Sequence, residues 1–161
     1  MSLTKVPYSM IKGAAINVLD YGADPTGLSD SATAIQTAIN YGSANYKTVY
    51  VPAGVYRCNT QLTVATTPAS HFFSIVGDGI TSCLWNTSTN SSDSVLLVGN
   101  AITGVETTGV HISNLLFWNP TGNGIKIQNT SKSKFNNLWA WSAQVGFIIQ
   151  EQSIINNFTN L

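Results

Sequence analysis

Near its C-terminal end the sequence repeats one four-residue pattern three times, as Ile112-Ser113-Asn114-Leu115, Phe135-Asn136-Asn137-Leu138 and Phe158-Thr159-Asn160-Leu161. Successive copies begin 23 residues apart. A second pattern keeps nearly the same period, since Gly124–Ile127 and Gly146–Ile149 begin 22 residues apart. A constant period of this length indicates one structural unit that stacks on its own copies.

Each unit has the features of a β-strand. Short apolar alternation, β-branched and aromatic residues, and Gly or Asn at the breaks are all typical of strands and their turns. Leucine-rich repeats share the period but need several leucines at fixed offsets, which this sequence lacks. We therefore predict an all-β fold, a parallel β-helix with coils of about 23 residues.

The chain is expected to have three parts. Residues 1–13 predict an extended N-terminal arm, residues 14–47 a capping strand, loop and helix, and residues 48–161 the coils of the β-helix. Because the third copy of the pattern stops at Leu161, we expect the coils to be incomplete at the C-terminus and the chain to be the front part of a longer protein.

A helix is predicted from an N-cap at Ser29 or Asp30 to about Tyr41. It would lie across the end of the solenoid and cover the first coil, which prevents pairing at that edge. Its apolar side is formed by Ala32, Ile35, Ala38 and Ile39.

Composition limits the possible partners. The 161 residues can bury a sizeable core, but only 9% of them are charged and the formal net charge is zero. Charge therefore gives no reason to expect binding to nucleic acid or to an anionic membrane, and no apolar run approaches the length needed to span a bilayer. No signal peptide is visible at Met1, which indicates synthesis in a cytoplasm. Cys58 and Cys83 are 25 residues apart, close to the length of one coil, so they could stack on neighbouring coils. We predict two reduced thiols, with a disulfide as the minor alternative.

Three stretches near the N-terminus carry a family resemblance. Residues 17–27 read NVLDYGADPTG, residues 29–39 read SDSATAIQTAI, and residues 48–56 read TVYVPAGVY. Together they resemble the opening of the pectate-lyase-like right-handed β-helix superfamily, in which a strand and a D-[FY]-G-A turn precede a capping helix. Residues 5–13, KVPYSMIKG, resemble the lead-in of bacteriophage tail fibres and tailspikes.

This resemblance implies a homotrimeric appendage of the phage virion that contacts other tail proteins and recognises bacterial surface polysaccharide. Two functions remain open. The segment is the structural and attachment portion of a tail fibre or tailspike, or it belongs to a polysaccharide depolymerase, a glycosidase or lyase, whose active site lies on later coils. A secreted, monomeric pectin-type enzyme is a third alternative, and the missing signal peptide and the phage-like arm argue against it.

Strand alternation predicts which side chains of the coils point inward. Ile112, Leu115 and Phe117 should face the core of one coil. On the next coil the same places are taken by Phe135, Leu138 and Ala140. The three asparagines at the bend, Asn114, Asn137 and Asn160, should stack in a column whose amides form a hydrogen-bonded structural ladder.

The same alternation turns Leu116, Trp118, Trp139 and Trp141 outward. An apolar strip of this size needs a partner. The partner is either a neighbouring subunit of a trimer or a sugar that packs on the indole rings. A third alternative is a different register, which would place these side chains in the core.

Catalytic residues cannot be assigned from the sequence. Glycoside hydrolysis needs a pair of carboxylates, and lyase chemistry needs a base. Asp20, Asp24 and Asp30 suit turn and N-cap roles better than catalysis, and the remaining candidates do not cluster at coil spacing. These candidates are Asp93, Glu106, Glu151, Lys126, Lys132, Lys134, His71 and His111. We expect no metal site and no cofactor.

Overall fold

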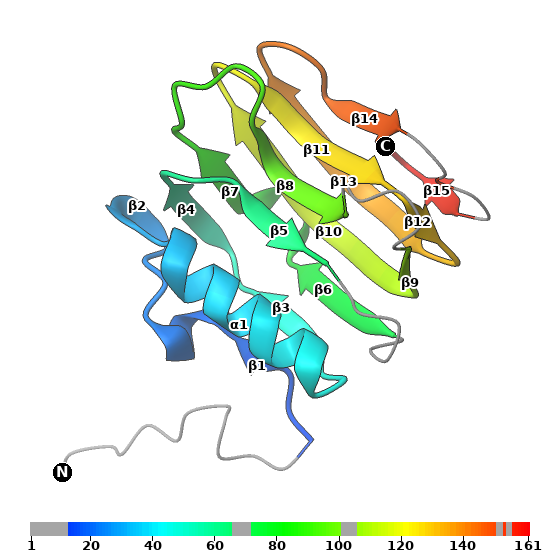
Figure 1. Ribbon diagram of the computed structural model, residues 1–161. Coiled ribbons are helices and arrows are strands. Elements are labelled where there is room, and N and C mark those ends of the chain that lie inside the picture. The colour runs from blue at the N-terminus through cyan, green and yellow to red at the C-terminus, as the bar shows by residue number, and fades with distance from the viewer. Residues whose placement is uncertain (1–12, 66–71, 101–105, 151–152, 154–155) are drawn as a thin grey trace, which may run out of the picture.

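The computed structural model describes residues 13–65, 72–100, 106–150, 153 and 156–161. Within these residues the chain folds as a solenoid of stacked parallel strands with one α-helix at its lower end (Figure 1). Every strand pair is parallel, and right-handed crossovers are the rule for such connections. The predicted right-handed parallel β-helix with an N-terminal helix is confirmed. The expected arm at residues 1–13 lies, apart from Gly13, outside the described residues.

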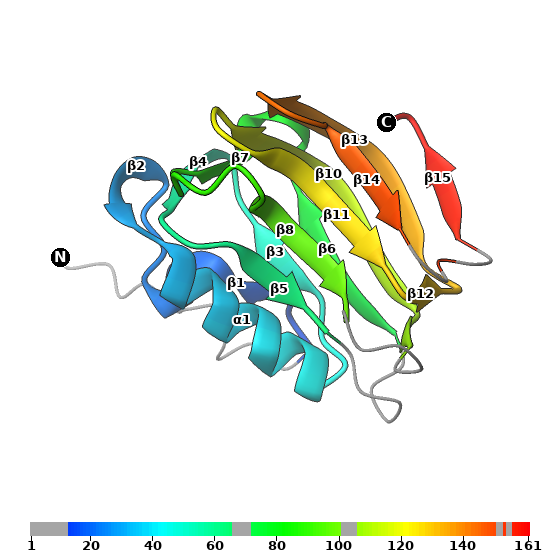
Figure 2. The ribbon, with the colours of Figure 1, turned by 45° about the horizontal axis from the view of Figure 1, so that its top comes forward.

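The strands form three sheets that run along the solenoid. The largest contains β1 Ile16–Asn17, β2 Thr26–Asp30, β3 Val49–Val51, β4 Gly54–Cys58, β6 Phe73–Gly77, β7 Ser82–Asn86, β10 Val110–Asn119, β13 Lys134–Ser142 and β15 Asn157–Thr159. The second contains β5 Leu62–Val64, β8 Ser94–Gly99, β11 Asn123–Gln128 and β14 Phe147–Gln150. The third is the short pair β9 Thr107–Thr108 and β12 Thr130–Ser131. Figure 2 shows the first two sheets side by side along the stack.

Long strand β10 joins two parts of the largest sheet. Its first half pairs with β6 and its second half with β7, while β13 pairs with both halves. Between the halves the chain bends at Asn114, which has a positive φ of 58°. The predicted pairing of the repeated pattern is confirmed, since Ile112 lies opposite Phe135 and Leu115 opposite Leu138.

The core is a set of inward columns, one side chain per coil. Ile112, Leu115 and Phe117 are fully buried, as predicted. The column that contains Phe117 runs through Tyr56, Leu84, Phe117 and Ala140, so a large ring is followed by a small side chain on the next coil. Burial of such side chains supplies most of the stabilisation of a solenoid of this kind.

Helix α1, Ala32–Ala44, covers the lower end of the stack and contacts β1, β3, β5 and β6 (Figure 1). The predicted apolar side is correct, but the predicted start is wrong by one or two residues. Ser29 and Asp30 belong to β2, and the N-cap position is Ser31. Asp30 still serves the helix, because its Oδ1 accepts a hydrogen bond from the Ala32 amide at 3.0 Å.

Two short 3-10 helices were not predicted. Val18–Tyr21 follows β1 directly, because Asn17 Oδ1 accepts a hydrogen bond from the Leu19 amide and turns the chain. Gly79–Thr81 forms the corner between β6 and β7.

The two cysteines do not stack. Cys83 lies opposite Val55, whereas Cys58 lies opposite Asn86, so the thiols stand in different columns. Both are free and buried, which confirms the prediction of reduced thiols.

Candidate functional site

Four aspartates of the described residues hold turns. Asp24, Asp30, Asp78 and Asp93 each accept two or more hydrogen bonds from nearby donors. These donors are Thr26 and Ser29 for Asp24, Ala32 and Asn59 for Asp30, Tyr50 and Ala53 for Asp78, and Ser88 and Asn90 for Asp93. Bonds from the side chain and backbone of Thr26 and from Ser29 lower the pKa of Asp24 to about 2. It is therefore ionised at neutral pH and cannot act as a general acid there.

Asp78 and Asp93 stand at different corners of the coil, because Asp78 follows β6 and Asp93 precedes β8. Glu106 is exposed just before β9, and Glu151 lies outside the described residues. Asp24, Asp30, Asp78 and Asp93 thus serve turns, and Asp78 and Asp93, at different corners, are not placed as the closely spaced pair that glycoside hydrolysis requires.

His111 lies at the start of β10, opposite Lys134 of β13. Burial and, secondarily, the positive charge of Lys134 lower the pKa of His111, so its imidazole is neutral at neutral pH. Its Nε2 lies 3.4 Å from the Asn136 amide nitrogen. His71 lies outside the described residues. No three His, Cys, Asp or Glu side chains among the described residues are grouped to bind a metal ion.

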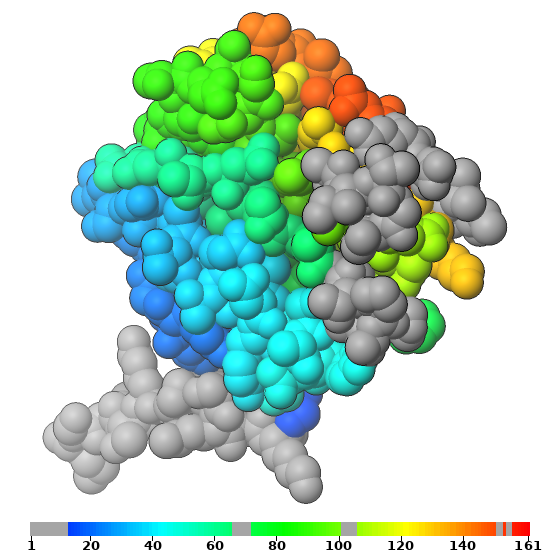
Figure 3. Space-filling view, in the orientation of Figure 1, coloured from blue at the N-terminus to red at the C-terminus, as the bar shows by residue number. Residues whose placement is uncertain are grey.

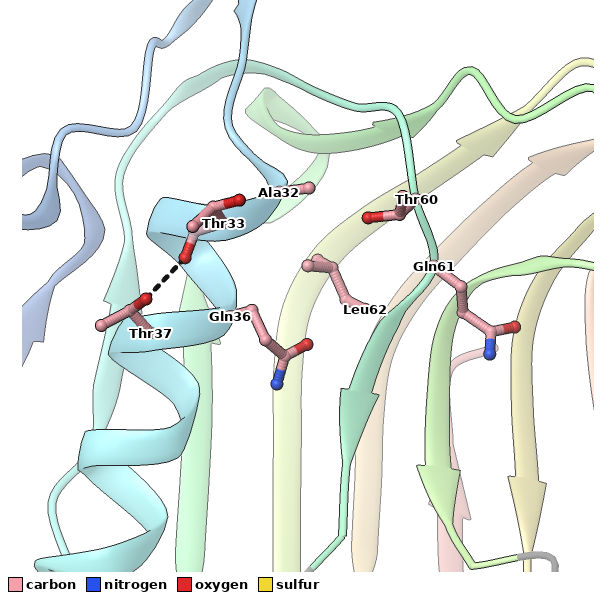
Figure 4. Close-up of a pocket in the computed structure, with 7 residues that line it drawn as sticks. All are labelled: Ala32, Thr33, Gln36, Thr37, Thr60, Gln61 and Leu62. Carbon is pink, nitrogen blue, oxygen red and sulfur yellow. Dashed lines mark hydrogen bonds between the residues drawn. The ribbon is translucent and has the colours of Figure 1, made fainter.

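A hollow of about 210 Å³ separates α1 from the segment leading into β5 (Figure 4). It is lined by Ala32, Thr33, Gln36, Thr37, Thr60, Gln61 and Leu62. Gln36 donates from Nε2 to the Thr63 carbonyl at 2.9 Å and accepts from the Thr63 amide at 2.8 Å. These two bonds pair the edge of β5 as a neighbouring strand would, so the hollow belongs to the cap of the solenoid.

The three asparagines of the repeated pattern lie in one column at the bend. Asn137 Nδ2 donates to Asn114 Oδ1 at 3.1 Å, and Asn160 Nδ2 donates to Asn137 Oδ1 at 2.9 Å. All three have a positive φ, between 49° and 58°. Asparagine tolerates this left-handed conformation better than most residues, which explains why it occupies each bend. Gly77 lies beside Asn114 on the preceding coil, where a Cβ atom would come within 2.3 Å of the Asn114 carbonyl oxygen.

A second asparagine pair, which the sequence analysis missed, closes the next corner. Asn86 and Asn119 end β7 and β10 and are fully buried. Asn119 Nδ2 donates to the carbonyls of Asp93 and Asn123, and its Oδ1 accepts from the Thr121 and Gly122 amides. The loops that follow these strands and β13 lie together at one end of the sheets (upper left in Figure 1). The longest of them, residues 87–93, protrudes as the green knob at the top of Figure 3.

Three indole rings stack along the solenoid, one from each coil. Trp118 lies opposite Trp85 on one side and Trp141 on the other. The ring centroids of Trp85 and Trp118 are 4.7 Å apart with an interplanar angle of 16°, and those of Trp118 and Trp141 are 5.5 Å apart with an angle of 19°. These separations are close to the spacing of neighbouring strands, about 4.8 Å. The rings therefore face one another along the stack.

A second column lies beside the indole stack, two residues earlier on each strand. It contains Val55, Cys83, Leu116 and Trp139. Trp139 is 41% exposed and Trp141 67% exposed, whereas Leu116 and Trp118 are half-buried. The two columns, with Arg57 and Trp85, form one outward surface, called here the tryptophan face: Val55, Arg57, Cys83, Trp85, Leu116, Trp118, Trp139 and Trp141.

All four tryptophans of the chain lie on this face. Strand alternation in the repeated pattern predicts Leu116, Trp118, Trp139 and Trp141 on one surface but does not include Trp85. The loop that follows residues 82–86 is longer than the loops that follow β10 and β13. The 23-residue period therefore does not align Trp85 with Trp118. The available signal was the sequence Cys83-Leu84-Trp85, which matches Leu116-Phe117-Trp118 in its apolar character and in its final tryptophan.

A hollow of about 300 Å³ lies at the end of the indole stack near the corner loops. Its walls are mostly apolar and are formed by Trp118, Asn119, Pro120, Trp141, Ser142 and Ala143. Because the Asn119 carboxamide is fully used in the corner, the hollow offers aromatic surface and the Ser142 hydroxyl.

The stacked parallel strands define the chain as a parallel β-helix protein. More narrowly, it belongs to the family described as rhamnogalacturonase A/epimerase, pectate lyase-like, whose model matches residues 15–142. No curated protein sequence matches the chain significantly. None of the helices in the described residues has the length and apolar character needed to span a membrane.

Solved structures with similar folds include several large proteins. ORF18 of Geobacillus virus E2 is 25% identical with a TM-score of 0.60, over 77% of this chain and 25% of that one. Tailspike protein 3 of bacteriophage CBA120 is 12% identical with a TM-score of 0.65, over 91% of this chain and 27% of that one. The A-module of a mannuronan C-5 epimerase from Azotobacter vinelandii is 20% identical with a TM-score of 0.58, over 86% and 41%. The chain thus spans about a quarter of the two viral proteins.

Proposed function

We propose that this chain is the structural and attachment portion of a bacteriophage tail fibre or tailspike that recognises a bacterial surface polysaccharide. The observation that carries the proposal is the 25% identity to a protein of Geobacillus virus E2 over 77% of the chain, with a TM-score of 0.60. Membership in a family named for polysaccharide-modifying enzymes supports a carbohydrate as the target. In this role the chain is part of a homotrimer in the virion tail and contacts other tail proteins.

A structural role is also supported by how the polar residues are used. Asp30, Asp78 and Asp93 are engaged in turns, and the buried asparagines Asn86 and Asn119 close corners of the coil. Rigid, fully bonded corners suit a shaft that holds a recognition site at a distance.

The alternative is a polysaccharide depolymerase whose active site lies on coils outside this segment. The family name supports it, because rhamnogalacturonase and epimerase activities both act on polysaccharide chains. In that case the described coils position the catalytic coils and do not themselves carry the chemistry.

Binding and cleavage measurements separate these roles. The protein, together with any coils that follow this segment, is immobilised and tested against a panel of purified capsular and O-antigen polysaccharides by biolayer interferometry. Any polysaccharide that binds is then incubated with the protein, and its size distribution and newly formed reducing ends are measured. Binding without a change in chain length supports the attachment role. Shortened chains support the depolymerase, and a complete lack of binding across the panel contradicts both.

A further inference from the structure

The tryptophan face presents the edges of its rings to the outside. Trp118 has one indole on each side at 4.7 Å and 5.5 Å, so both of its ring faces are covered. The near-parallel planes, tilted by 16° and 19°, leave the rims of the rings as the outward surface. An apolar ridge of indole edges is therefore the feature that needs a partner.

A sugar is poorly suited to this ridge. A pyranose packs its C–H groups on the face of an aromatic ring, where the negative side of the quadrupole lies. Along most of the ridge these faces are already occupied by neighbouring indoles. Free ring surface is confined to the last coil of the ridge, where Trp139 is 41% and Trp141 67% exposed.

The shape of the ridge favours a partner with the same repeat. The two columns follow strands β4, β7, β10 and β13, and therefore extend along the solenoid by about 15 Å. They are only two residues apart along each strand, or about 7 Å. A long, narrow, regularly spaced ridge matches side chains that recur at the same spacing, and another copy of this solenoid supplies them.

Charge does not oppose contact between copies. The only charged residue of the tryptophan face is Arg57, and Asp30 lies opposite it on β2. The two charges balance locally, so identical ridges can approach without like-charge repulsion.

We propose that the tryptophan face lies along the axis of an assembly of three parallel copies of this chain, with the indole edges meeting at its centre. A flat pairwise interface of standard size needs about 800 Å² from each partner, more than a narrow ridge provides. Ridges that converge on a shared axis need less width from each copy, and the Asn, Ser and Thr side chains beside them form the polar rim. The inference rests on the trimer in the proposed function and assigns its contact surface.

The test is the native mass of the chain and two variants by light scattering. For the natural sequence we expect three times the subunit mass of 17.2 kDa. The double variant Trp139→Lys/Trp141→Lys should have the subunit mass, because it places charges on the two most exposed members of the ridge. The matched control, Phe72→Lys, replaces an aromatic side chain that is 79% exposed outside this face and should keep the threefold mass. Circular dichroism verifies that each variant is folded.

Tryptophan fluorescence gives a second readout that reports on this face alone, because all four tryptophans lie on it. On dilution below the association range, emission should shift to longer wavelength and acrylamide quenching should increase. The Phe72→Lys control should behave in the same way. The double variant keeps only Trp85 and Trp118, and its spectrum should not change with concentration.

Two results would overturn the inference. One is a natural chain with the subunit mass at all concentrations; the other is a double variant that keeps the threefold mass. If that variant keeps its mass but loses binding to a polysaccharide that the natural chain binds, the ridge is a sugar site instead. The mass measurement uses no polysaccharide, so its outcome is independent of the binding panel that tests the proposed function.

Discussion

The two halves of the solenoid make the same bend in different ways. In the C-terminal half, β10 and β13 pass through the bend without interruption, and a single left-handed asparagine turns the chain. In the N-terminal half, β3 and β4 are separated by Pro52 and Ala53, and β6 and β7 by residues 78–81. The strands nevertheless stay in register across the boundary, since β10 pairs with both β6 and β7.

This difference shows what fixes the cross-section of the coil. Where the corner is one residue, neighbouring coils can bond through identical side chains, as Asn114, Asn137 and Asn160 do. Where the corner is longer, different groups link the coils, and the Asp78 carboxylate accepts hydrogen bonds from the Tyr50 hydroxyl and the Ala53 amide. The inward columns are common to both halves, and they keep the coils aligned.

The largest effect should come from the shared core. Phe117→Ala removes a fully buried ring from the column that links Leu84 of the N-terminal half to Ala140 of the C-terminal half. Because Ala140 is small, the cavity cannot be filled from that side, and we expect a loss of about 3–5 kcal/mol in the free energy of unfolding. Urea denaturation at fixed protein concentration measures it.

Leu84→Ala is the matched variant in the N-terminal half. It should cost about 2–4 kcal/mol, and both variants should unfold in one transition if the halves share a core. Two separate transitions would show instead that the halves are independent units and that each has a core of its own.

The strands and the core of the C-terminal half could be predicted because a one-residue corner preserves the period. Ile112, Leu115 and Phe117 follow from alternation alone. In the N-terminal half the corners vary in length, so β7 and Trp85 had no counterpart to align with. In that half, single side chains such as Gln36 do the work of a neighbouring strand or of an asparagine ladder. They could not be predicted from a repeated pattern, because each occurs once and bonds to the backbone of a distant segment.

The asparagine ladder should give the next largest effect. Asn137→Ala removes two side-chain hydrogen bonds. It also places alanine at φ 49°, a left-handed conformation that asparagine tolerates better. We therefore expect a loss of about 2–3 kcal/mol in the free energy of unfolding. Asn137→Gly keeps the left-handed bend at low cost and should lose only about 1–2 kcal/mol. Equal denaturation midpoints for Asn137→Gly and the natural chain would mean that the bend matters and the ladder does not.

At the opposite end of the stack, Gln36→Ala should expose the edge of β5. Loss of the two bonds to Thr63 should cost about 1–2 kcal/mol and, more specifically, accelerate hydrogen exchange at the Thr63 amide. Asn40→Ala is the control, because Asn40 bonds to Gln36 but not to the strand. An unchanged exchange rate at Thr63 in Gln36→Ala would contradict the strand-like role of this carboxamide.

The smallest effect should appear at alkaline pH and should come from the N-terminal half, which holds both thiols. Burial raises the pKa of Cys58 to about 12 and that of Cys83 to about 11, from 9.0. The unfolded chain therefore releases these protons first, and the stability present below pH 9 should decline as the pH rises from 9 towards 11. The slope is at most about 1.4 kcal/mol per pH unit for each thiol.

Urea midpoints at pH 8 and pH 9 measure the onset of this decline, about 0.7 kcal/mol for the two thiols together. This window stays below 10.0, the ordinary pKa of tyrosine, so Tyr56, whose own pKa burial raises to about 12, adds little to it. The double variant Cys58→Ala/Cys83→Ala is less stable at both pH values because of the space it leaves, but its midpoint should change less between them. A decline of the same size in that variant would assign the alkaline sensitivity to other groups. The thiols would then contribute no more to the alkaline loss of stability than the C-terminal half, which contains no cysteine.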